Sequence, residues 1–231
     1  MTSKSNKKEA TIDPLFEEKF QELMAIEDGV YYLYATYEDP ISGKISDDIR
    51  TEIIEKSAQI GYDLADDIMR KSPNKSVMER IEENNIELVL DDSESSMKFV
   101  YFGTYETDGP ITLYQGNLAK SEQLLEDIEI DWLTIEQVGD IILAHELFHY
   151  YEDVYPEMYT NTKEIELWKL GPYTHKSKLI CPSEIAAMAF AKKLLNLDFN
   201  SSAINYLLYS SIDEKAGQAF YKNMHKLNEN N

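Results

Sequence analysis

Two histidines stand four residues apart in the segment His145-Glu146-Leu147-Phe148-His149. On a helix this spacing places both imidazoles on the same face, one turn apart, where they can bind a single zinc ion. Glu146 lies about 100 degrees around the helix from His145, beside the metal, where its carboxylate can take a proton from a metal-bound water. The segment therefore predicts His145 and His149 as zinc ligands and Glu146 as the general base of a hydrolytic site.

A catalytic zinc ion usually has three protein ligands and one open position. Glu184 is the stronger candidate for the third ligand, because it opens a predicted helix whose many alanines allow close approach to another helix. Its alternative role is that of a first-turn carboxylate favoured by the helix dipole. Glu152 lies one turn beyond His149, which suits a residue behind the ligands or at the surface better than a ligand.

Other interpretations of these residues stay open. The two histidines could be core residues satisfied by hydrogen bonds. The pattern Glu146-x-x-His149 is half of the motif that carboxylate-bridged di-iron bundles use twice, but the sequence has no second Glu-x-x-His. Cys181 is followed by Pro182 and has no evident paired base, which disfavours a cysteine nucleophile.

The elements that must position these residues follow from the spacing of apolar side chains. The pattern predicts a mainly helical α+β chain in which a small sheet packs beside the helix that carries the two histidines. Thr134 and Gln137 form a predicted capping box at the start of that helix. Residues 30–37 could form either a strand or a helix, and their pattern does not decide between the two. Helices are expected at residues 14–27, 46–71, 77–84, 118–127, 135–154, 182–195 and 211–227, and strands at residues 86–90, 97–104 and 111–114.

The length of 231 residues fits a single domain. Residues 1–13 are polar and are expected to form a disordered leader, with one domain over residues 14–231. Within it we expect a helical part at about 14–85, a catalytic core at about 86–200 and a last helix at about 211–227.

Composition also limits the partners and the compartment. The formal net charge of -21 repels phosphate backbones and anionic lipid headgroups, which disfavours direct binding to nucleic acid or to a membrane. No apolar run is long enough to cross a bilayer. The single cysteine cannot form an internal disulfide, so we expect a cytoplasmic protein. The oligomeric state is not specified by any pattern.

Two stretches resemble the ImmA/IrrE family of zinc metallopeptidases, which are related in plan to the thermolysin-like gluzincins. They are Ala144 to His149 and the helix from Glu184 to Leu195, with its Phe-Ala pair and paired leucines. The resemblance covers roughly residues 46–200. It implies a thermolysin-like minimal catalytic core, with Zn2+ held by His145, His149 and Glu184 and with Glu146 as base. It also implies a helix-turn-helix transcriptional repressor as a candidate substrate.

The leading hypothesis is a cytoplasmic zinc endopeptidase that hydrolyses a protein or peptide substrate. The alternative is an inactive zinc-binding scaffold or sensor that acts by binding a protein partner, and a third reading is a globular protein without metal. The presence of Glu146 favours the enzyme, because a scaffold needs only the ligands.

Two further predictions concern the substrate. Tyr173 and His175 precede the glutamate helix and are candidates for donating a hydrogen bond to the oxyanion, although both could be ordinary loop residues. The resemblance implies that substrate adds to a sheet as a strand, and residues 111–114 are predicted to form the exposed edge for it. Pro110 cannot donate a ladder hydrogen bond, which favours an edge over the alternative of an interior strand.

Overall fold

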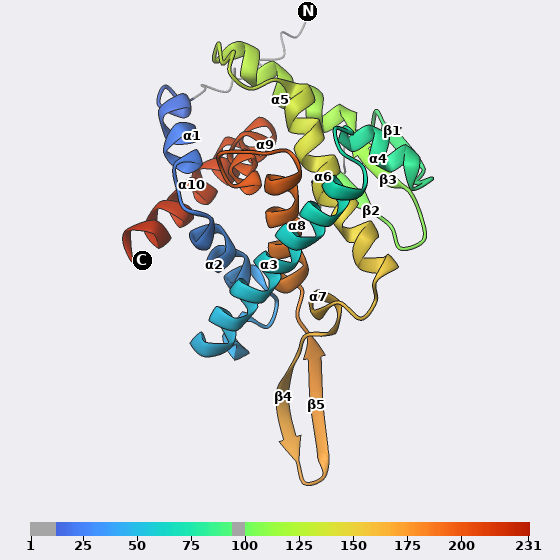
Figure 1. The fold of residues 1–231 in the computed structure, drawn as a ribbon. Coiled ribbons are helices and arrows are strands. Elements are labelled where there is room, and N and C mark those ends of the chain that lie inside the picture. Colours follow the sequence, from blue (N-terminus) through green and yellow to red (C-terminus); the bar gives the residue numbers. More distant parts are fainter. Residues whose placement is uncertain (1–12, 94–99) are drawn as a thin grey trace, which may run out of the picture.

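The computed structural model describes residues 13–93 and 100–231. The predicted leader therefore lies almost entirely outside the described residues, as does the first part of the strand expected at residues 97–104. The described chain is mainly helical with a small mixed sheet and a separate two-stranded sheet, so it belongs to the predicted α+β class (Figure 1).

The helices occupy both ends of the chain and its middle. They are α1 (Phe16–Met24), α2 (Asp28–Glu38), α3 (Asp47–Lys71), α4 (Val77–Glu83), α5 (Gln115–Asp127), α6 (Ile135–Val154), α7 (Tyr159–Thr162), α8 (Cys181–Leu194), α9 (Asn205–Ile212) and α10 (Glu214–Glu229), with short 3-10 turns at Ser42–Lys44 and Ser201–Ile204. The undecided residues 30–37 lie in α2, and α9 was not expected from the sequence. The predicted capping box of Thr134 and Gln137 starts α6 and is confirmed.

The small sheet contains β1 (Leu88–Asp91), β2 (Gly103–Tyr105) and β3 (Ile111–Tyr114), in the order β1-β3-β2. β3 pairs in parallel with β1 and antiparallel with β2, so it is the interior strand. The prediction that residues 111–114 form an exposed edge is wrong. Pro110 precedes the paired residues, and Ile111 makes the first ladder contact by donating its N–H to the carbonyl of Glu87. Among the described strands, β2 forms the edge beside α6.

Helix α8 lies at the centre of the helical part, between α3 and α6. Gly61 of α3 lets the two helices approach closely: a Cβ at this position would overlap the carbonyl oxygen of Ala186 and lie 2.9 Å from the Cβ of Ala189. The close approach predicted for the alanine-rich helix is therefore confirmed. One cluster of buried apolar side chains extends from Phe16 to Met224.

The helices near the two ends of the chain pack against each other. Phe16 of α1 stacks on Tyr206 of α9, with 4.6 Å between the ring centroids. Tyr34 of α2 packs edge-on against Phe220 of α10. Of these four residues, Tyr34 and Phe220 line one wall of the region that faces α6 and α8.

The second sheet is a hairpin of β4 (Glu164–Leu170) and β5 (Tyr173–Lys178) that extends away from the rest of the molecule (Figure 1). The sequence analysis did not predict it. Its signal is the pair Gly171-Pro172 between two short β-prone runs, and Gly171 takes a positive φ of 58 degrees that suits a tight turn.

Within the described part of the chain, no helix combines the length and apolar character needed to span a membrane.

Candidate metal centre

Helix α6 is anchored by apolar residues on either side of its histidines. Ala144, Leu147 and Phe148 have no exposed surface, whereas His145 and His149 are half-buried. The Phe148 ring lies against Phe190 of α8, with 5.8 Å between the centroids. This packing leaves the histidines little freedom to turn away from α8.

Three side chains converge where α6 faces the first turn of α8. The ligand atoms of His145, His149 and Glu184 all lie within 4.8 Å of one another. Nε2 of His145 lies 3.3 Å from one carboxylate oxygen of Glu184, and Nε2 of His149 lies 3.9 Å from the other. The structure therefore brings together the three residues predicted as ligands, and it is the one such group found within residues 13–93 and 100–231.

The second ring nitrogen of His149, Nδ1, contacts residues other than Glu184. This nitrogen lies 3.1 Å from the hydroxyl of Ser183, and that hydroxyl donates to Glu152 at 2.6 Å. Glu152 is buried, and its Oε2 lies 3.6 Å from Nδ1 of His149. This arrangement fixes the imidazole and leaves Nε2 facing Glu184, so Glu152 lies behind His149.

The electrostatics of the cluster favour a cation. Burial alone would raise the pKa of Glu184, but the hydrogen bond and charge of His145, together with His149, hold that pKa at about 2. Burial alone would lower the pKa of His149, but Glu152, Glu184 and Glu146 raise it to about 9. In the metal-free chain the carboxylates therefore hold a proton on His149, at a position where a metal ion could supply the positive charge instead.

Glu146 lies beside this cluster, next to strand β2. A Cβ on Gly103 of β2 would lie 3.1 Å from Cγ of Glu146 and would overlap Ile142. The absence of a side chain at Gly103 thus lets the sheet edge approach α6 at the position of the predicted base.

A cleft of about 850 Å³ opens onto the cluster. His145, Glu146 and Glu184 lie in its lining, and 43% of the Glu184 side chain is exposed. Residues 100–103 form part of one wall, and α2, α9 and α10 supply other parts. A chain or small molecule in this cleft can therefore reach the three functional side chains.

The structure does not bring Tyr173 and His175 to the cluster. Both are exposed residues of β5, in the hairpin that extends from the molecule (Figure 1), and neither lines the cleft. An extended strand moves away by about 3.3 Å per residue, so these side chains are carried away from α8 instead of folding back over it. The geometry does not support their predicted role as oxyanion donors.

Sequence reasoning missed two residues at the site. Ser183 carries a signal only in retrospect, as the residue before Glu184 in the first turn of α8. Tyr209 of α9 lines the cleft together with Glu184, and its ring packs edge-on against Phe220. Burial, followed by the charges of Tyr34, Glu38 and Glu184, raises the pKa of Tyr209 to about 12, so its hydroxyl remains a hydrogen-bond donor at neutral pH.

The structure also bears on the cysteine alternative. Cys181 is buried, and burial together with Asp39 raises the pKa of its thiol to about 12. Asp39 instead accepts the backbone N–H groups of Ile180 and Cys181, and so caps the start of α8. A thiol that stays protonated is a poor nucleophile.

Comparisons with protein-family models, with curated proteins and with solved structures find no match to this chain. The resemblance to the ImmA/IrrE family stays a prediction, and any functional conclusion depends on the geometry of the site.

Proposed function

We propose that this chain is a zinc-dependent endopeptidase. The observation that carries the proposal is the convergence of His145, His149 and Glu184, at a position where His145, Glu146 and Glu184 line an open cleft. Two imidazoles and one carboxylate form a ligand set known from catalytic zinc sites, which keep a fourth position open.

The distances fit such an ion. Zinc binds nitrogen and oxygen ligands at about 2.0–2.2 Å, so two ligands of a tetrahedral site lie roughly 3.4 Å apart. Nε2 of His145 lies 3.3 Å from one carboxylate oxygen of Glu184, and Nε2 of His149 lies 3.9 Å from the other oxygen. Small side-chain movements would bring the second pair to the same separation.

The bound ion would polarise the scissile carbonyl and lower the pKa of a water molecule beside it. Glu146 takes the proton of the attacking water and passes it to the leaving amine. Ser183 and Glu152 keep His149 oriented throughout.

Tyr209 replaces Tyr173 and His175 as the proposed donor to the developing oxyanion. Its phenol lines the cleft near Glu184 and stays protonated, so it can donate a hydrogen bond to the carbonyl oxygen.

The substrate is proposed to be a protein or peptide that lies extended beside β2. This strand is one of the two edges of the described three-stranded sheet and contacts α6 through Gly103, so main-chain pairing along it would hold a peptide next to Glu146. The resemblance given above adds a transcriptional repressor as candidate substrate and the cytoplasm as compartment.

The test combines metal analysis with cleavage of a mixed peptide library followed by mass spectrometry. We expect stoichiometric zinc, cleavage that a chelator abolishes, and a Glu146→Gln variant that keeps zinc but loses about 10²–10⁴-fold in rate. Tyr209→Phe should lower kcat with little change in KM, because the hydrogen bond forms only in the transition state.

The outcomes separate the hypotheses. Stoichiometric zinc without cleavage of any peptide would favour the scaffold or sensor. A purified chain that binds no zinc at any concentration tested would contradict both.

A further inference from the structure

The outer part of the β4–β5 hairpin has no partner in the rest of the described chain. We call residues 168–176 the hairpin tip. Every residue of the tip is exposed, and Leu170 and Tyr173 are 72% and 74% exposed, the highest values among the exposed large apolar side chains described. A two-stranded hairpin alone is at best marginally stable in water, so this segment is expected to gain from a contact.

The tip is amphipathic. Trp168 pairs across the strands with His175, and Leu170 pairs with Tyr173. Because side chains alternate along a strand and cross-strand partners share a face, all four lie on one face of the hairpin. Trp168 and His175 also stack, with 5.4 Å between their ring centroids.

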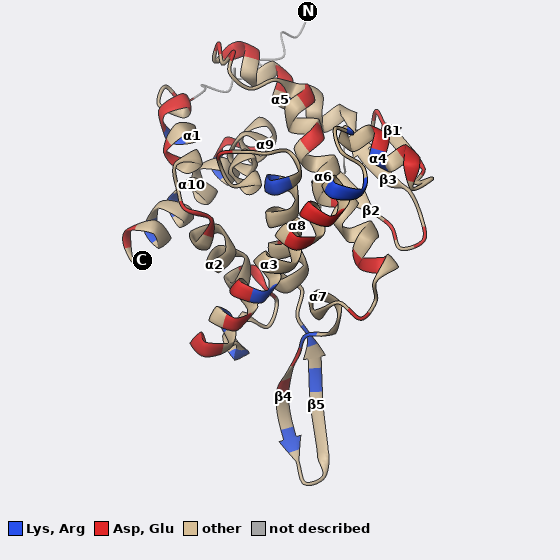
Figure 2. Cartoon of the chain, in the orientation of Figure 1, with Lys and Arg blue, Asp and Glu red and all other residues tan. Residues whose placement is uncertain are grey.

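The opposite face of the tip is basic. Lys169 pairs with Thr174, and Lys176 lies two residues further along the same face of β5, where its cross-strand partner is Glu166, just outside the tip. The tip contains these two lysines and no aspartate or glutamate. Figure 2 shows basic positions on both strands of the hairpin and an acidic stretch on β4, while further acidic positions are spread over the helices.

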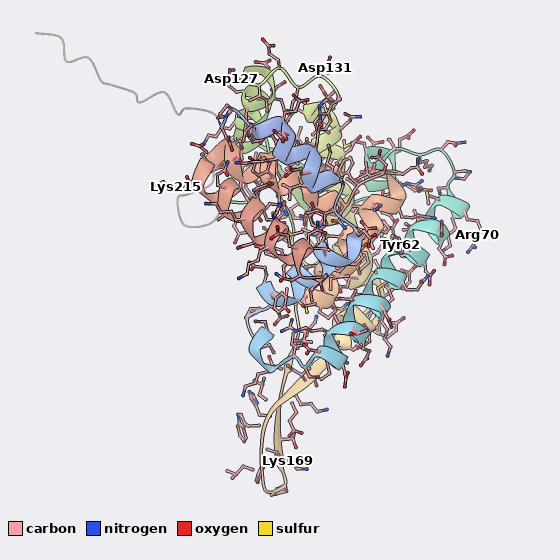
Figure 3. All side chains as sticks on the ribbon, turned by 90° about the vertical axis from the view of Figure 1, so that its left-hand side faces the viewer. Tyr62, Arg70, Asp127, Asp131, Lys169 and Lys215 are labelled. Carbon is pink, nitrogen blue, oxygen red and sulfur yellow. The ribbon has the colours of Figure 1, made fainter. Side chains whose placement is uncertain are left out.

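The hairpin separates these lysines from the acidic body. Seven residues of β4 span roughly 23 Å at about 3.3 Å per residue. Figure 3 shows Lys169 at the far end of the hairpin, and Asp127 and Asp131 at the opposite end of the molecule. Since the screening length at physiological salt is about 8 Å, the charge of the body is largely screened at the tip. The net charge of -21 therefore does not prevent the tip from approaching an anionic surface.

We propose that the hairpin tip docks the chain onto an anionic lipid bilayer. Trp168 and Tyr173 are residue types that favour the membrane interface, and Leu170 lies on the same face and supplies apolar surface. Lys169 and Lys176 lie on the polar face, as in amphipathic segments that lie in the plane of the headgroups. A bilayer can accept this narrow face because it requires no complementary shape.

The proposal is independent of the peptidase activity, and vesicle binding tests it. The full chain is mixed with vesicles of phosphatidylcholine alone, or of equal parts phosphatidylcholine and phosphatidylglycerol, and bound protein is measured by flotation. Binding is expected only with the anionic lipid. Lys169→Glu with Lys176→Glu should weaken it by at least about 25-fold, about fivefold for each lysine. Trp168→Ser with Leu170→Ser and Tyr173→Ser should abolish it.

A matched control carries the same change in charge at another surface. Lys215 and Lys222 are exposed residues of α10, so Lys215→Glu with Lys222→Glu should leave the vesicle affinity almost unchanged. Equal loss in this control and in the hairpin variant would overturn the proposal, because net charge alone would then account for the binding.

The two tryptophans of the chain give a second measurement. Trp132→Phe leaves Trp168 as the single tryptophan, and Trp168→Phe leaves Trp132, which precedes α6. With anionic vesicles containing brominated acyl chains, quenching is expected for Trp168 and not for Trp132. Quenching of Trp132 alone, or no vesicle binding by the intact chain, would overturn the proposal. So would hairpin-dependent self-association in sedimentation without lipid binding, since the tip would then contact a second copy.

Discussion

The junction of α6 with α8 and the hairpin tip differ in which of their side chains are buried and which are exposed. At the junction, half-buried polar groups are fixed by apolar neighbours without exposed surface, such as Leu147 and Phe148. At the tip, large apolar side chains such as Leu170 are exposed, and no described segment covers them. The comparison indicates that a change at the junction should disturb geometry over several residues, whereas a change at the tip should remain local.

The largest expected difference concerns metal binding. His145→Ala or His149→Ala removes a ligand, so neither variant should retain stoichiometric zinc after dialysis. His175→Ala makes the same substitution on the hairpin and should retain all of it. Elemental analysis of the purified proteins measures the difference. Full zinc content in both junction variants would show that the metal, if present, binds elsewhere.

The next effect concerns the residues behind His149. Removing the hydroxyl of Ser183 or the carboxylate of Glu152 should weaken zinc binding about 10–100-fold, because the imidazole loses its fixed orientation. Each variant should still bind zinc when the zinc concentration is high. Ser177→Ala on β5 is the matched control and should have no effect. Competition with a chromophoric chelator gives the affinities, and an unchanged affinity for Ser183→Ala would contradict the proposed orientation of His149.

Substitutions at two glycines, Gly61 of α3 and Gly171 of the hairpin, compare the effect of each region on the free energy of unfolding. Gly61→Ala adds a Cβ that overlaps the carbonyl oxygen of Ala186, so it should lower the free energy of unfolding by about 1–3 kcal/mol. It should also weaken zinc binding, because Ala186 lies two residues from Glu184. Gly171→Ala meets no atom within 4 Å and costs only the strain of its positive φ, about 1 kcal/mol.

Urea unfolding followed by circular dichroism measures both variants. Equal zinc affinity in Gly61→Ala and in the unsubstituted chain would contradict the dependence of Glu184 on the packing between α3 and α8.

The smallest expected effect is a pH dependence of the free energy of unfolding of the metal-free chain. The pKa of His149 rises from 6.5 to about 9, so its protonated form stabilises the fold fully below pH 6.5, and this contribution is lost as the pH rises towards 9. The pKa of Glu184 falls from 4.5 to about 2, so its contribution is present above pH 4.5 and is lost as the pH falls towards 2.

These two groups therefore stabilise the metal-free chain most between pH 4.5 and 6.5. His149→Gln should remove the loss between pH 6.5 and 9, whereas His175→Gln on the hairpin should leave the profile unchanged. Zinc must displace the proton of His149, so its affinity should rise with pH over the same range. Urea midpoints with and without zinc measure both trends, and a flat profile above pH 6.5 would contradict the assignment.

The sequence alone determined the parts of this protein whose information is local. Helix α6 has the predicted bounds, because its capping box and its apolar spacing are properties of neighbouring residues. His145 and His149 lie close together for the same reason, because a helix places residues four apart on the same face, one turn from each other. The proximity of Glu184 was predicted less directly, because it depended on the resemblance of its helix and the residues alone left a first-turn carboxylate as the alternative.

Only the tertiary structure decided the order of strands, the direction of the hairpin and the walls of the cleft. The position of β3 between β1 and β2 depends on pairing partners distant in sequence, which Pro110 did not reveal. Tyr209 reaches the cleft because α9 packs against helices far along the chain, and Tyr173 leaves it because β5 continues outward. A residue's spacing in the sequence specifies its neighbours within one element, whereas contacts between elements depend on how all of them bury their apolar faces together.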